Sequence, residues 1–121
     1  MIILKESHTG VIGEMQCVKG NERVVSTTIT SCIVIIGLNA ERKINAAHLL
    51  IDKTYENIQV VLDDLKELFS GCSNIVVIGQ LDFWRENILN QIFSSIGVTG
   101  VFNRSEGQYI VSANVSSDSL E

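Results

Sequence analysis

Two stretches of the chain repeat apolar residues every three or four positions, which is the spacing that gathers them on one face of an α-helix. The first covers residues 55–69, with Thr54 placed to cap its start and Gly71 to end it. The second covers residues 82–96, with Asp82 as its N-cap and Gly97 at its end. The pattern therefore predicts two long amphipathic helices, each with one face against a sheet.

The remaining apolar stretches are short and rich in β-branched residues, which is typical of strands. They cover residues 23–28, 32–38, 44–51, 74–78, 98–102 and 108–113. Runs such as Ile-Val-Ile-Ile and Ile-Val-Val-Ile are apolar at every position, as expected for strands covered on both faces. Turn residues predict hairpins at 39–42 and at 103–107. We expect an α/β fold of the layered α+β kind, with a mixed sheet and two covering helices.

Length and charge limit the number of domains and the kinds of partner that the chain can have. The chain has 121 residues, which suits one domain over residues 1–113, followed by a polar tail at 114–121. It has neither a long apolar run nor a charged and apolar leader, so we expect a cytoplasmic protein without membrane insertion. The net charge is −5 and the nine basic residues are scattered, which argues against a nucleic-acid partner.

The cysteines predict reduced thiols. Cys17, Cys32 and Cys72 are odd in number and far apart, unlike a disulfide framework. Without a CxxC or HxxxH pair, the spacing predicts no metal site. We interpret Cys17 and Cys72 as structural, and Phe69 and Trp84 as core residues at helical spacing.

Cys32 and His48 are the strongest candidates for catalytic residues. If the hairpin at the Asn-Ala-Glu-Arg turn sets Leu38 opposite Arg42, Cys32 lies directly opposite His48, with Cβ atoms about 4.5–5.5 Å apart. If Leu38 instead opposes Lys43, the imidazole turns to the other face of the sheet. The first register predicts a Cys/His pair.

Such a pair can perform nucleophilic chemistry. The thiolate is the nucleophile, and an imidazole can take the thiol proton and later return it to a leaving group. A hydroxyl from Ser26, Thr27 or Thr28 could orient the ring. The alternative is that Cys32 is a small buried hydrophobe and His48 a hydrogen-bonded structural residue. Sequence spacing leaves both open.

The order of short motifs resembles that of the chemotaxis protein-glutamine deamidases of the CheD family. Residues 12–14, Ile-Gly-Glu, are similar to the signature near that family's N-terminus, and Ser31-Cys32 to its Gly-Ser-Cys nucleophile motif. His48, in Ala-Ala-His-Leu-Leu, falls where the family has its histidine. Residues 106–109, Glu-Gly-Gln-Tyr, resemble the family's last turn, so the likeness covers about residues 10–113.

The resemblance implies a catalytic set of Cys32, His48 and Ser26, with Thr27 as an alternative orienting residue and Ser31 supporting an oxyanion site. The family's third residue is a threonine six positions before the cysteine, where this chain has Ser26. Thr30 replaces a glycine, Asn45-Ala46 replace a double glycine, and the glycine-rich segment is shortened to residues 99–103.

The implied activity is hydrolysis of a glutamine side chain in a partner protein, with no cofactor and no metal. The implied substrate is a bacterial chemoreceptor, and a CheC-type chemotaxis phosphatase is a possible partner. The glycine losses favour an alternative, a weakened binding module that docks to such a phosphatase or receptor. A third reading, a cysteine hydrolase of small amides, requires an enclosed pocket.

Overall fold

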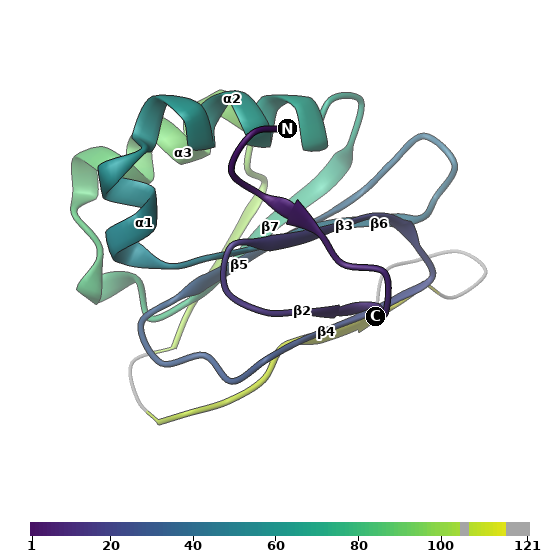
Figure 1. Ribbon diagram of the computed structural model, residues 1–121, viewed down its shortest axis with the longest axis horizontal. Helices are drawn as coiled ribbons and strands as arrows, with labels where there is room; N and C mark the ends of the chain where they lie inside the picture. Colours follow the sequence, from purple (N-terminus) through teal and green to yellow (C-terminus); the bar gives the residue numbers. More distant parts are fainter. Residues whose placement is uncertain (105–106, 116–121) are drawn as a thin grey trace.

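A six-stranded mixed sheet forms the middle of three layers (Figure 1). The computed structural model describes residues 1–104 and 107–115. The strand order in this sheet is β1-β3-β6-β5-β7-β8. The strands are β1 (Lys5–Glu6), β3 (Gln16–Asn21), β5 (Ile33–Leu38), β6 (Ile44–Leu49), β7 (Ser73–Gly79) and β8 (Gly100–Asn103). The mixed sheet expected from the sequence is thereby confirmed.

Three helices cover one face of this sheet (Figure 1). They are α1 (Ile51–Glu56), α2 (Ile58–Leu68) and α3 (Glu86–Ile96), and a short 3-10 turn, η1 (Leu81–Phe83), precedes α3. The first predicted helix is divided at Asn57, so Thr54 lies inside α1 and does not cap it. Asp82 lies in η1, and Arg85 is the residue before α3. Gly97 ends α3 in the left-handed conformation, as predicted.

The β5–β6 hairpin forms where it was predicted, but with a different register. Leu38 pairs with Ile44 and Val34 with His48, so Cys32 is not directly opposite His48. The reason is a longer turn. The Asn39 side-chain oxygen accepts hydrogen bonds from the amides of Glu41 (2.9 Å) and Lys43 (3.0 Å), which draws two further residues into the loop.

A second, three-stranded sheet covers the other face of the main sheet (Figure 1). Its order is β2-β4-β9, with β2 (Val11–Ile12), β4 (Arg23–Ser26) and β9 (Ser112–Asn114). The predicted terminal hairpin of residues 98–102 with 108–113 is therefore wrong. β8 pairs in parallel with β7, whereas β9 pairs with β4 in the other sheet. The segment β7-α3-β8 is a β-α-β crossover, for which parallel pairing is the rule.

Two apolar cores separate the three layers. The helix-side core contains Cys17, Phe69 and Trp84, which confirms Phe69 and Trp84 as core residues. The core between the two sheets, here called the intersheet layer, contains Cys32, Val34 and residues of β2, β4 and β9. All six residues of β5 are buried, as expected for a strand covered on both faces.

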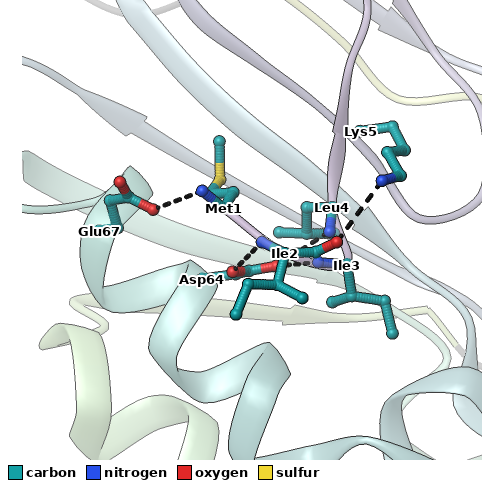
Figure 2. A network of polar contacts seen from close by, with 7 residues as sticks. All are labelled: Met1, Ile2, Ile3, Leu4, Lys5, Asp64 and Glu67. Atoms are coloured by element: carbon teal, nitrogen blue, oxygen red, sulfur yellow. Dashed lines mark hydrogen bonds and ion pairs between the residues drawn. The ribbon is translucent and has the colours of Figure 1, made fainter.

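Two carboxylates of α2 hold the N-terminal segment (Figure 2). Glu67 lies 3.0 Å from the terminal ammonium of Met1, and Asp64 binds the backbone of the next three residues. Asp64 accepts hydrogen bonds from the amides of Ile2 (2.8 Å), Ile3 (2.8 Å) and Leu4 (2.9 Å). Burial of Asp64 acts to raise its pKa, but these hydrogen bonds and the nearby terminal ammonium outweigh it, so the pKa is lowered. The carboxylate thus stays charged and holds the segment that leads into β1.

The C-terminal segment is ordered slightly further than the predicted boundary at residue 113. Asn114 still belongs to β9, and the Val115 amide donates to the Glu22 carbonyl at 2.9 Å. Residues 116–121, and the predicted turn residues 105 and 106, lie outside the described residues. No helix in the described part of the chain is long and apolar enough to cross a bilayer.

Candidate functional site

Cys32 and His48 face the same intersheet layer although they are not directly opposed. Because the register is displaced by two residues from the predicted one, every side chain keeps its face. Cys32 packs in the intersheet layer with Val34, and Val34 is the Cα partner of His48. The two residues are thus diagonal neighbours, which in an antiparallel pair lie about 7–8 Å apart. The structure brings the thiol and the imidazole onto one surface at the open end of the hairpin.

One ring nitrogen of His48 is fixed by the backbone of β2. His48 is fully buried, and its Nδ1 lies 3.0 Å from the carbonyl oxygen of Ile12. A carbonyl can only accept, so Nδ1 carries the hydrogen, and in the neutral ring Nε2 holds the lone pair. The same carbonyl also accepts the amide of Thr27 at 3.0 Å. The imidazole is therefore held in the tautomer that a general base acting through Nε2 requires.

The other ring nitrogen has no partner. Nε2 of His48 is buried and makes no hydrogen bond with any residue the structure describes. Leaving a buried acceptor unpaired costs about 1–3 kcal/mol, which makes it unusual in a structural residue. The hydroxyls of Thr54 and Tyr109 are also unpaired, but burial raises the pKa of Tyr109 above 10.0 and a threonine hydroxyl does not titrate. Among these three groups, only the imidazole has a basic nitrogen with a free lone pair.

The Cys32 thiol is protonated in this conformation. Its residue is 4% exposed. Burial raises the pKa of the thiol from 9.0 to about 11, and the negative charge of Glu14 adds to the rise. Within the described residues, no hydrogen bond joins the sulfur to the imidazole. The thiol and the imidazole thus share one face of the sheet without a hydrogen bond between them.

Ser26 lies in the second sheet and is engaged elsewhere. It is 2% exposed, and its hydroxyl accepts the Val111 amide at 2.9 Å. The expectation that the Ser26 hydroxyl orients the ring is not met in this conformation, because the Ile12 carbonyl occupies Nδ1. Thr27 has an exposed side chain and contributes only its amide to Ile12.

The backbone around Cys32 is tightly held. Ser31, the predicted supporting residue, accepts the Trp84 indole N–H through its carbonyl at 2.7 Å, which anchors the segment to the helical layer. Gly79 approaches so closely that an added Cβ would lie 2.6 Å from the Cys32 carbonyl oxygen. The Cys32 amide makes no hydrogen bond within the described part of the chain. An unpaired backbone N–H next to the sulfur is the kind of donor that can stabilise an oxyanion.

The second sheet does not cover the whole of the main-sheet face that lines the intersheet layer. One row of Cα partners runs from His48 through Val34 and Ile78 to Phe102 on the edge strand β8. Exposure rises along this row, from 0% at His48 and 1% at Val34 to 58% at Phe102, with Ile78 partly buried. This face of the sheet thus passes from the buried imidazole to an open apolar edge three strands away.

Two contributors to this site were not predicted from the sequence. The Ile12 carbonyl holds the ring, and the Gln16 side chain lies beside it, because Gln16 is the Cα partner of His48 across β3 and β6. A backbone carbonyl has no residue signature, so no pattern could have identified it. The Ile-Gly-Glu segment predicted a family resemblance but not a contact with the His48 ring.

Metal-site geometry and comparison with known proteins give no further information on this site. The described residues contain no group of three or more His, Cys, Asp or Glu side chains that could hold a metal ion. Comparisons of the chain with protein-family models, with curated proteins and with solved structures gave no match.

Proposed function

We propose that this chain is a protein-glutamine deamidase that hydrolyses the side-chain amide of a glutamine in a partner protein. The observation that carries the proposal is the buried, unpaired Nε2 of His48 on the same face as Cys32. The fixed tautomer supports it, since Nε2 is then free to accept a proton. The resemblance of the motifs around Cys32 and His48 to the CheD family points to the same chemistry, with a chemoreceptor as the substrate class.

The reaction begins with the thiol. As the sulfur of Cys32 attacks the carboxamide carbon, the thiol proton passes to Nε2 of His48, and a C–S bond forms. The Cys32 amide stabilises the oxyanion, which is worth about 3 kcal/mol for one good donor. The C–N bond then breaks, and His48 returns the proton to the departing ammonia.

Water completes the reaction. It attacks the thioester carbon and gives a proton to Nε2, and the sulfur leaves and regains that proton. The products are glutamate and ammonia, and Cys32 and His48 return to their starting states. The chemistry consumes only the amide and water, so it needs neither a metal nor an organic cofactor.

The thiol must become accessible for this reaction. With its pKa near 11, Cys32 is protonated at neutral pH, so the base must act during the attack rather than before it. A protein substrate can supply the energy for such a change by docking at the apolar edge of the main sheet, where Phe102 is 58% exposed. An open apolar edge suits a protein better than a small amide, which would require an enclosed pocket.

A second function is favoured by the burial of Cys32. A thiol that is 4% exposed with a raised pKa also fits a binding module that has lost activity and docks to a chemotaxis phosphatase or receptor. The two functions share a surface but differ in products, and only the deamidase releases ammonia.

The test is incubation with the cytoplasmic domains of chemoreceptors and measurement of ammonia, with mass spectrometry to locate each new glutamate. The deamidase predicts that the wild type and Cys72→Ala release ammonia and that Cys32→Ala does not. If the wild type binds the receptor domains but releases no ammonia, the result would favour the binding module over the deamidase. Equal ammonia from Cys32→Ala would refute the assignment of the nucleophile.

A further inference from the structure

The turn between β2 and β3 is closed by two hydrogen bonds between the same two residues. The Gln16 amide donates to the Gly13 carbonyl at 3.0 Å, and the Gly13 amide donates to the Gln16 side-chain oxygen at 2.7 Å. Met15, inside this turn, has a φ of 60°, which is unfavourable for a residue with a side chain. The turn is thus a strained conformation that the Gln16 side chain helps to hold.

This turn is hydrogen-bonded to the strand that carries His48. The Met15 amide donates to the His48 carbonyl at 2.7 Å, and the Met15 sulfur accepts the Leu50 amide at 3.3 Å. Gln16 is the Cα partner of His48, so the amide side chain and the imidazole stand on the same face of the sheet. The backbone and the ring of His48 are therefore held by one short segment.

The planarity of the peptide bond links Gln16 to the ring. The amide of Gly13 and the carbonyl of Ile12 belong to the same peptide group, which is planar. The Gln16 side-chain oxygen fixes the N–H of this group, and the opposite end of the group receives Nδ1 of His48 at 3.0 Å. Rotation of this peptide would break both hydrogen bonds together.

We infer that Gln16 is a positioning residue, which holds the Ile12-Gly13 peptide and thereby keeps His48 in the Nδ1–H tautomer with Nε2 available as a base. The value of this arrangement to catalysis rests on the proposed function. The arrangement itself does not, and it can be tested without any substrate. The Thr27 amide also binds the Ile12 carbonyl, so loss of Gln16 should weaken the control of the tautomer rather than abolish it.

The test is ¹⁵N NMR of the histidine rings, which distinguishes the two neutral tautomers. The chain contains two histidines, and His8 is exposed, so it serves as an internal reference. Wild-type His48 should show the Nδ1–H form. In Gln16→Leu, which lacks the acceptor, the ratio of Nε2–H to Nδ1–H forms should rise about fivefold, as expected for the loss of one neutral hydrogen bond.

Two variants serve as controls. Gln16→Glu keeps an oxygen acceptor for Gly13 and should restore the wild-type tautomer, whereas Gln59→Leu, on the exposed face of α2, should change nothing. Gln16→Met repeats the test if Gln16→Leu does not fold. A stability loss with an unchanged tautomer in the Leu or Met variant would overturn the inference. Absence of ammonia release from the wild type would remove the proposed function and leave this result standing.

Discussion

Asp64 and His48 are both buried polar residues, but the fold treats them in opposite ways. Asp64, in the helical layer, is 2% exposed, and its carboxylate accepts three backbone amides (Figure 2). His48, in the intersheet layer, is 0% exposed, and only one of its two ring nitrogens has a partner in the described structure. One group is saturated with hydrogen bonds, and the other keeps an unused acceptor.

This difference separates a stabilising role from a chemical one. A buried carboxylate with three donors strengthens the fold, because each bond to a charged group contributes about 1.5–3 kcal/mol. A buried acceptor without a donor costs free energy, and functional sites are where such costs are commonly retained. The comparison therefore predicts that substitutions at Asp64 reduce stability and that substitutions at His48 reduce chemistry.

The largest effect on stability is expected at Asp64. Asp64→Ala removes the acceptor of three amides and should lower the free energy of unfolding by about 3 kcal/mol or more. Its neighbour Asp63 is exposed and accepts a hydrogen bond from the Gln59 side chain at 3.2 Å, so Asp63→Ala should change stability by less than about 0.5 kcal/mol. Urea denaturation measures both variants, and equal losses would mean that the Asp64 contacts do not stabilise the N-terminal segment.

A smaller loss is expected at Gly79, behind Cys32. A Cβ at this position would lie 2.6 Å from the Cys32 carbonyl oxygen and 2.7 Å from Ile33 Cγ2, so the backbone must move. Gly79→Ala should cost about 1–3 kcal/mol. Gly100→Ala is the matched control, since its nearest contact is a Val76 methyl at 3.1 Å. Thermal denaturation in which the two variants lose the same stability would show that the close approach at Cys32 is not restrictive.

The two regions should also respond to opposite ends of the pH range. The lowered pKa of Asp64 means that its stabilisation is present above pH 3.8 and is lost as the pH falls through its folded pKa. Burial raises the pKa of both Cys17 and Cys32 from 9.0 to about 11, so the folded state retains protons that the unfolded state loses, and stability falls between pH 9 and 11. Cys72 and Tyr109 act in the same alkaline direction.

Unfolding measured as a function of pH can separate these contributions. Cys32→Ala should reduce the alkaline loss and leave the acid loss unchanged. An alkaline loss of the same size in wild type and Cys32→Ala would show that the thiol ionises as readily in the folded chain as in the unfolded one.

A smaller effect on stability than at Asp64 or Gly79 is expected at His48. His48→Phe loses the hydrogen bond to Ile12 but also removes an unpaired acceptor, and the Ile12 carbonyl keeps the Thr27 amide. These changes oppose each other, so the free energy of unfolding should change by no more than about 1 kcal/mol. A loss as large as that of Asp64→Ala would identify His48 as a structural residue and would remove the contrast between the two regions.

The sequence predicted the elements better than their pairing. Periodicity located the helices and most strands, because burial of one face or of both faces leaves a direct pattern. The hairpin register failed by two residues because the Asn39 side chain enlarges the turn, which spacing alone does not reveal. The parallel partner of residues 100–103 was also missed, although the strand-helix-strand order before it was a usable signal. The strands β1, β2 and β3 were not predicted, because β1 and β2 have two residues each and β3 is mixed in polarity.

The candidate site was predicted only in part. One of the two predicted registers placed Cys32 and His48 on one face. The observed register differs from it by two residues, which keeps both side chains on that face, whereas a difference of one residue would have separated them. The support of the ring could not be predicted, because it comes from the Ile12 carbonyl and from a turn closed by Gln16. Such contacts depend on three-dimensional placement rather than on residue type.

The most direct test of the Cys32/His48 pair is the rate of Cys32 alkylation by iodoacetamide at neutral pH, followed at each cysteine by mass spectrometry. If Nε2 of His48 takes the thiol proton during attack, His48→Phe should slow the alkylation of Cys32 at least about tenfold. Half-buried Cys72 should react at the same rate in both proteins. Equal rates at Cys32 in wild type and His48→Phe would contradict the claim that the imidazole serves the thiol.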